Sequence, residues 1–257
     1  MTRSVARLAG AAATLLALIG FASAAEITVY STIGVKSALE ELAPTFEKTS
    51  GHKLNIVWST GRLLAKRLHD GEQADVLIAA PGEIDDLLKD GKLVSGTPVV
   101  LSRVVFAVGI KSGAAKPDIS SPEAFKRALL AAKAIAYTNP AAGGQSGVYF
   151  AKQLERMGIA EQMKDKTKFP PPGGFVSTLI VNGEADLAIQ SKPELLAIPG
   201  VDVVGPLPGD MAFTSTHTAA ILTNAKDAGA AKAFIASMLA PEAQALFRSK
   251  GYEPPNS

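Results

Sequence analysis

Cysteine is absent from this sequence of 257 residues, so disulfide-stapled scaffolds, cysteine nucleophiles and thiolate metal sites are excluded. Aromatic residues are also few, at 6%, and charged residues make up 19% against 47% hydrophobic ones. This balance is typical of a globular chain rather than a disordered one. The length suits one large domain or two lobes.

Catalytic and metal-binding motifs are missing as well. The sequence has no G-x-x-x-x-G-K-[ST] phosphate loop and no H-E-x-x-H zinc motif, and Gly144–Val148 lacks the last glycine of a nucleophile elbow. The histidines show no metal-ligand spacing. We expect His52 and His69 at the surface and His217 in a strand. The sequence therefore predicts a protein that is not an enzyme and that has no metal and no cofactor.

The one long apolar run in the sequence lies near the N-terminus. Two arginines and no acidic residue precede the uncharged stretch 8–21. Ala22-Ser23-Ala24 follows this stretch and places small residues at alternate positions. The run is shorter than the roughly 20 residues that span a bilayer, so it predicts a cleaved secretory signal over residues 1–24 and a periplasmic product. Cleavage removes Arg3 and Arg7, leaving 24 basic against 24 acidic side chains. Such a neutral protein has no long-range attraction for nucleic acid.

Short apolar runs then alternate with amphipathic segments, a pattern that predicts an α/β fold with sheets covered by helices. The first set of expected strands and helices alternates through residues 27–30, 35–48, 54–58, 63–70, 76–80 and 84–90, followed by extended stretches at 99–101 and 104–108. A second set has helices at 122–132, 148–157 and 175–181 and strands at 135–137, 187–190 and 201–204. An extended stretch at 216–222 precedes terminal helices at 228–239 and 241–250.

Two sets of elements imply two lobes. The terminal helices need a surface to pack on, and the economical solution is that they return to the first lobe. Crossovers near Ser102 and Pro206 then give lobe 1, residues 25–103 with 207–257, and lobe 2, residues 104–206. A ligand cleft is expected between two such lobes.

Hydroxyl and glycine residues cluster at four junctions that lead into expected helices. These clusters are Ser31–Gly34, Ser59–Arg62, Gly143–Gly147 and Pro172–Gly174. A helix N-terminus offers unpaired amides and a partial positive charge, so several of them around one cleft would hold an anion. The alternative is that Ser31, Thr32, Ser59, Thr60 and Ser146 serve only as N-caps.

Two cations stand at the start of expected helices, where the helix dipole disfavours them. Arg62 and Lys36 would each fit an anionic ligand, Arg62 through its bidentate fork, or they are solvated surface side chains. Gln190 and Ser191 end an expected strand, where they add neutral donors or simply begin a loop.

A series of short motifs runs along nearly the whole mature chain. They are Val29-Tyr30, Ala38-Leu39, Phe46-Glu47-Lys48, Leu64-Ala65-Lys66, Gly71, Ala74-Asp75-Val76, Gly91-Lys92-Leu93-Val94, Asn139-Pro140, Gly147-Val148-Tyr149 and Gly183-Glu184-Ala185-Asp186. Their order and spacing resemble those of the extracytoplasmic solute-binding proteins of ABC importers, in particular the molybdate-binding group. The resemblance implies a two-lobed periplasmic binding protein fold of type II, a small anionic ligand, an inner-membrane ABC permease as partner and a monomeric state.

The resemblance also implies a set of ligand-binding residues, in which hydroxyls and amides hold a tetrahedral oxyanion. They are Ser31, Thr32, Gly34, Ser59, Thr60, Gly61, Arg62, Ser146, Gly147, Gly173, Gln190 and Ser191. This chain departs from the group's pattern at three of them: Gly34 stands where a serine is expected, Arg62 where a small polar residue is usual, and Ser191 where a tyrosine is expected.

The leading hypothesis from the sequence is thus a periplasmic protein that captures a molybdate- or tungstate-type oxyanion for an ABC permease. A binding protein for a small organic carboxylate is the first alternative, and it follows if Arg62 lines the cleft. An exported enzyme or a sensor domain on the same fold is the second. An enzyme would need a proton-transfer pair or a nucleophile in the cleft.

Overall fold

The computed structural model describes residues 24–171 and 173–255. The expected signal segment lies outside the described residues except for Ala24. Within the described residues, no helix combines the length and the apolar character needed to cross a membrane.

The secondary structure alternates in type, as the sequence predicts. The strands are β1 (Glu26–Thr32), β2 (Lys53–Ser59), β3 (Val76–Ala79), β4 (Val99–Lys111), β5 (Ile135–Ala136), β6 (Thr167–Lys168), β7 (Leu187–Ser191), β8 (Val201–Pro206) and β9 (Thr214–Ile221). The α-helices are α1 (Lys36–Ser50), α2 (Gly61–His69), α3 (Pro81–Lys89), α4 (Pro122–Ala131), α5 (Gln145–Arg156), α6 (Ala160–Lys164), α7 (Ser177–Val181), α8 (Lys192–Leu196), α9 (Ala228–Leu239) and α10 (Pro241–Ser249). Short 3₁₀ turns are η1 (Ile33–Val35), η2 (Pro140–Ala142) and η3 (Gly209–Met211).

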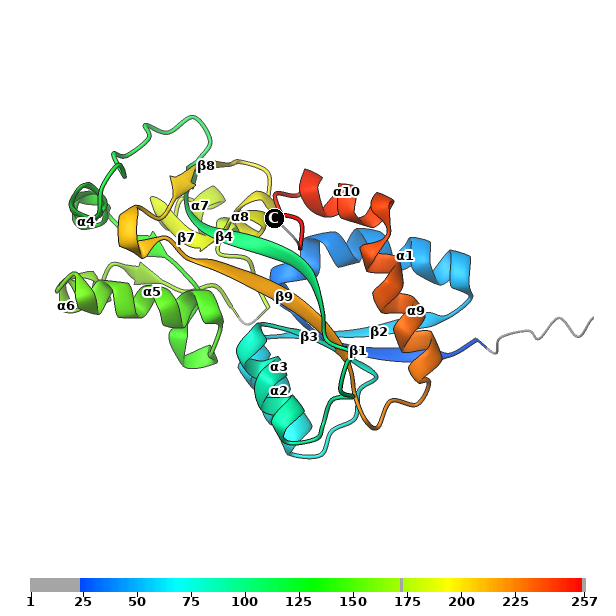
Figure 1. The fold of residues 1–257 in the computed structure, drawn as a ribbon. Coiled ribbons are helices and arrows are strands. Elements are labelled where there is room, and N and C mark those ends of the chain that lie inside the picture. The colour runs from blue at the N-terminus through cyan, green and yellow to red at the C-terminus, as the bar shows by residue number, and fades with distance from the viewer. Residues whose placement is uncertain (1–23, 172, 256–257) are drawn as a thin grey trace, which may run out of the picture.

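The long strand β4 connects the two parts of the sheet, and β9 runs antiparallel beside its first part (Figure 1). The strand order is β2-β1-β3-β9-β4-β7-β5-β6, with β8 also pairing with β4. Residues 99–105 of β4 pair with β9, whereas residues 106–111 pair with β7 and β8. We call the part built on β2, β1, β3 and β9 the first half and the part built on β7, β5, β6 and β8 the second half. β4 changes partners between Val105 and Phe106.

The expected break near Ser102 is not a break in the strand. The pattern predicted two separate stretches because polar residues interrupt the apolar run, yet β4 is continuous and has only a register shift between Val100 and Ser102. Ser102 is fully buried, so a polar residue here marks a buried partner rather than the end of the strand.

Helices cover both faces of the first half of the sheet (Figure 1). Side chains alternate along β1, so Val29 faces the core formed with α1 and α9, and Tyr30 faces the core formed with α2 and α3. The ring centroids of Phe46 in α1 and Phe234 in α9 are 5.1 Å apart. The terminal helices therefore pack on α1, and burial of each such aromatic contributes about 2 kcal/mol.

Ser121 caps α4, since its hydroxyl accepts from the Ala124 amide at 3.1 Å. The prediction that His52 lies at the surface was wrong. Its Nδ1 accepts from the Ala25 amide, and its buried ring stacks on Phe46, because the turn after α1 folds it back beneath β1. His69 is exposed, as expected.

Three short elements were not predicted: α6, β6 and α8. Each has five residues or fewer, so it shows too little periodicity to be detected by pattern. In addition, α5 begins at Gln145 rather than at Val148, because Gly144 acts as its N-cap. The presence of α8 and the earlier start of α5 matter for the site. They place Ser191 at the start of α8, and Ser146 and Gly147 at the start of α5.

The candidate ligand-binding cavity

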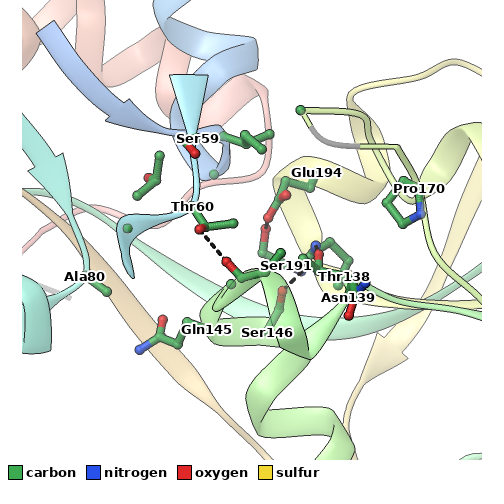
Figure 2. A pocket seen from close by; sticks show the side chains of 18 of the residues that line it. Ser59, Thr60, Ala80, Thr138, Asn139, Gln145, Ser146, Pro170, Ser191 and Glu194 are labelled. Carbon is green, nitrogen blue, oxygen red and sulfur yellow. Dashed lines mark hydrogen bonds between the residues drawn. The ribbon is translucent and has the colours of Figure 1, made fainter. Parts of the chain in front are cut away.

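A cavity opens between the two halves of the sheet, where strands end and helices begin (Figure 2). From the first half it is lined by Thr32, Ile33, Gly34, Ser59, Thr60, Gly61, Ala80, Glu83, Val104 and His217, and Phe106 lies where β4 passes into the second half. From the second half it is lined by Thr138, Asn139, Ala142, Gly144, Gln145, Ser146, Pro170, Pro171, Gly173, Gly174, Gln190, Ser191 and Glu194. No lysine or arginine is among the described residues that line it.

Most of the residues predicted to bind ligand lie on this cavity, but three do not. Ser31, Arg62 and Gly147 are not among the lining residues. Ser31 is fully buried, and its hydroxyl donates to the Thr32 carbonyl at 3.2 Å. Gly147 has a different role, since a side chain there would overlap the carbonyl of Thr138. This glycine lets α5 approach the end of β5 closely.

Thr32 is the hydroxyl with the clearest capacity for a ligand. Its Oγ1 is buried and has no hydrogen-bond partner among the described residues. Although Thr32 precedes η1, its side chain makes no capping bond. A buried polar atom without a partner costs about 1–3 kcal/mol, which a ligand at this place would recover.

Thr60 joins the two halves across the cavity. Its Oγ1 donates to the carbonyl of Ala142 at 2.6 Å and also accepts from the Leu63 amide at 3.4 Å, which caps α2. The capping alternative therefore applies to Thr60, whereas no capping bond is made by Ser146 or Thr32. Figure 2 shows Ser59 and Thr60 on one side of the cavity and the residues of the second half on the other.

A hydrogen-bonded group lies on the wall of the second half, centred on Thr138. Its Oγ1 accepts from Gln190 Nε2 at 2.7 Å and from Ser146 Oγ at 3.4 Å. Gln190 Oε1 in turn accepts from the Ser191 amide at 2.9 Å. Because Thr138 accepts both bonds, its own proton is available to a ligand. The wall thus offers neutral donors, the type of group that the sequence predicted.

Two carboxyl groups also line the cavity, and both are protonated more readily than usual. Burial raises the pKa of Glu194 to about 7, although Ser191 Oγ donates to its Oε2 at 2.7 Å, which opposes that shift. Burial also raises the pKa of Glu83. Glu83 lies beside Gly61, where a Cβ would be 3.1 Å from the Glu83 carboxyl carbon. The cavity accordingly has acid–base groups from both halves.

His217 reaches the cavity from β9 and lies against Gly34. A side chain at position 34 would overlap His217 Nε2. Its Nδ1 is 3.2 Å from Ser102 Oγ, and burial lowers the pKa of the imidazole to about 4. Tyr252 closes the site from behind, where its hydroxyl donates to the Gly34 carbonyl at 2.6 Å.

The two cations singled out in the sequence lie outside the cavity. Arg62 is exposed, and its aliphatic chain packs on Gly143. A Cβ added to Gly143 would be 2.6 Å from Arg62 Cδ. Gly143 is left-handed, with φ +73°, which suits it to this close approach. Lys36 Nζ lies 5.9 Å from the Trp58 ring centroid and 5.6 Å from that of Phe175. These side chains contact the neighbouring walls without lining the cavity.

Glu83, Glu194 and His217 were not predicted as site residues. One signal for Glu194 was present: Ser191-Lys192-Pro193-Glu194 has the S-x-x-E spacing and the early proline of a helix start. His217 carries no local signal, because it reaches Gly34 only through the pairing of β9 with β3 and β4. Among the described residues, no group of His, Asp or Glu is arranged to hold a metal ion.

A chain whose two sheet halves are joined by the long strand β4, with a cavity between them, has the architecture of a two-lobed α/β binding protein. Comparison with known proteins defines the family: residues 27–253 match the model of the bacterial extracellular solute-binding proteins. The chain belongs to that family, which confirms the resemblance found in the sequence.

Individual relatives have more than one named role. An aconitate isomerase from a Pseudomonas species is 31% identical over 234 residues, covering 89% of this chain and 87% of the relative. A molybdate-binding protein from Azotobacter vinelandii is 27% identical over 239 residues, covering 90% of this chain and 91% of the relative. The solved periplasmic molybdate-binding protein from A. vinelandii superposes with a TM-score of 0.71 at 19% identity, covering 89% of this chain and 99% of that one. The structural likeness confirms the fold.

Proposed function

We propose that this protein is the extracytoplasmic binding component of an ABC importer, and that as a monomer it captures one small anion in the cavity and delivers it to an inner-membrane permease. The observation that carries the anion proposal is the convergence of turn η1 and the starts of α2 and α5 on the cavity, together with the unpartnered Thr32 hydroxyl. Closure of the halves about β4 and β9 would distinguish the loaded form from the empty one.

For the ligand we propose a small organic polycarboxylate rather than the molybdate-type oxyanion that the resemblance alone implies. Apolar side chains line part of the cavity, among them Ile33, Val104 and Phe106, and they suit a carbon skeleton. Glu83 and Glu194 disfavour a compact dianion wherever they ionise. An extended ligand can keep its carboxylates apart from them. The relative named aconitate isomerase supports the same class of ligand.

Thermal-shift screening of the chain that begins at Ala25 tests both parts of this proposal. The panel is molybdate, tungstate, sulfate, phosphate, citrate, cis-aconitate and succinate. A ligand at 100 times its dissociation constant stabilises the fold by about 2.7 kcal/mol. A shift with polycarboxylates supports the proposal, a shift with molybdate and tungstate alone favours the oxyanion alternative, and no shift with any anion contradicts anion binding.

A second candidate function is isomerisation of an unsaturated polycarboxylate, favoured by a specific observation. Glu83, Glu194 and His217 provide the proton-transfer groups that an enzyme on this fold requires. Removal of a proton from the ligand's methylene carbon and its return at the alkene carbon would move the double bond without an oxidant or cofactor.

Proton NMR of cis-aconitate incubated with the protein in D₂O tests this candidate. Isomerisation would give trans-aconitate signals, and exchange would replace methylene protons by deuterium. Isomerisation and deuterium exchange must both be lost in Glu194→Gln if this carboxyl transfers the proton. Binding without exchange or conversion leaves a binding protein alone.

A further inference from the structure

His217 occupies the place that a side chain at position 34 would otherwise fill. A Cβ on Gly34 would overlap His217 Nε2 and would be 3.2 Å from Cε1. Both residues line the cavity. An imidazole edge therefore fills the place on the cavity wall beside Gly34.

The hydrogen bond to Ser102 assigns the tautomer of this imidazole. Ser102 is fully buried, and its hydroxyl has His217 Nδ1, at 3.2 Å, as its hydrogen-bond partner among the described residues. A buried hydroxyl proton without an acceptor is costly, so Ser102 donates to Nδ1. The ring proton then resides on Nε2, the atom that faces Gly34.

The ring is neutral near pH 7, because burial lowers the pKa of His217 to about 4. A neutral Nε2–H is still a hydrogen-bond donor. The backbone of Gly34 is fixed from behind by Tyr252, whose hydroxyl donates to its carbonyl. The imidazole is thus held at one position on the cavity wall, and Thr32, whose hydroxyl has no partner among the described residues, precedes the turn that holds Gly34.

We propose that His217 Nε2–H contacts the ligand and sets the preference for a carboxylate over a tetrahedral oxyanion. This inference rests on the proposed function. A rigid, planar donor fixes one direction of approach and suits one carboxylate of an extended ligand. A compact dianion instead needs donors on all of its oxygens, and Gly34 supplies no hydroxyl to complete them.

A pair of substitutions separates the two nitrogens of the ring. The amide of His217→Gln places an N–H donor near the position of Nε2, whereas the shorter His217→Asn places its amide near Nδ1, beside Ser102. Calorimetric titration at about pH 7.5 would use citrate, cis-aconitate and molybdate as probes. Far-UV circular dichroism and the melting temperature of each unliganded variant monitor the fold.

We expect His217→Asn to weaken polycarboxylate binding about 10- to 100-fold, as for loss of a hydrogen bond to a charged group. His217→Gln should bind within about fivefold of the wild type. Should His217→Asn fail to fold, His217→Gln and Ser102→Ala carry the test. Loss of the Ser102 hydrogen bond lets the ring proton move between the two nitrogens, so Ser102→Ala should weaken polycarboxylate binding severalfold. His217→Gln should retain polycarboxylate binding.

Other results overturn the inference. Equal affinity in the wild type, the Asn variant and the Gln variant would show that Nε2 makes no ligand contact. Equal weakening in both variants would show a packing role. If wild-type protein binds molybdate but neither polycarboxylate, this inference fails while anion binding stands. If it binds none of the three probes, the proposed function itself fails.

Discussion

His217 Nε2 and the backbone of Gly34 are so close that no side chain fits between them. The two residues belong to strand β9 and turn η1, 183 positions apart in the chain. Their contact leaves no room for a side chain at position 34, so the imidazole fills that place on the cavity wall. A substitution at position 34 is therefore expected to move the side chain at position 217.

Gly34→Ser should displace the imidazole and weaken polycarboxylate binding about tenfold. Overpacking of this kind also lowers the free energy of unfolding by about 1–3 kcal/mol. Gly82→Ser is the matched control, because a Cβ there meets open space and Gly82 does not line the cavity. Calorimetric titration and urea unfolding measure both effects. Equal behaviour of the two serine variants would contradict the contact.

Glu194 and His217 should give opposite pH dependences of stability. The pKa of Glu194 is raised in the folded state to about 7, so its contribution is fully present below about pH 4.5 and is lost as pH rises toward 7. The pKa of His217 is lowered from 6.5 to about 4, so stability falls as pH drops between these values. Each contribution is about 3 kcal/mol, and the two slopes largely cancel between about pH 4.5 and 6.5.

Single substitutions should uncover each slope. With Glu194→Gln, the free energy of unfolding should rise with pH from about 4.5 to 6.5, and with His217→Gln it should fall over the same range. Urea denaturation at several pH values in this window measures both. Parallel profiles for the wild type and both variants would contradict the burial of these groups.

Arg62 should affect closure and not the choice of ligand. The side chain packs its aliphatic part on Gly143 in the other half, so Arg62→Ala should weaken all ligands by the same factor of about two to five. Arg62→Lys should be nearly neutral, since a lysine stem can make the same contact. A selective loss of carboxylate binding in the Lys variant would restore the ligand role that the sequence suggested.

Ser146 should contribute to affinity through the wall centred on Thr138. Ser146→Ala removes a hydroxyl from the cavity, with an expected loss of about tenfold in affinity. Gly144 caps α5, so no loss of capping stability follows. Ser31→Ala serves as the control, since Ser31 lies outside the cavity and should leave affinity unchanged. If Ser146→Ala leaves affinity unchanged but lowers stability, Ser146 is structural.

Export predicts a mature chain that begins at Ala25, because the sequence Ala22-Ser23-Ala24 fits signal peptidase. Intact-mass spectrometry of protein recovered from the periplasm of the native host checks this. A periplasmic product that retains Met1 would contradict cleavage, and retention in the cytoplasm would contradict export.

The sequence predicted the parts of the site that depend on local pattern. Thr60 could be found because a hydroxyl and a glycine precede an amphipathic helix, and the same logic located Ser146. Gln190 was found because it ends an expected strand. Arg62 satisfied that local pattern, yet the side chain turns toward Gly143, which only tertiary structure determines. The approach of His217 to Gly34 depends on strand pairing across the whole chain, so local periodicity carries no information about it.

The central claim is that the cavity binds one small organic polycarboxylate. Its most direct test is calorimetric titration of the chain starting at Ala25 with citrate, cis-aconitate and molybdate under one set of conditions. The account predicts one site per chain and at least tenfold tighter binding of a polycarboxylate than of molybdate. Tighter binding of molybdate, with no heat from either polycarboxylate, would contradict it.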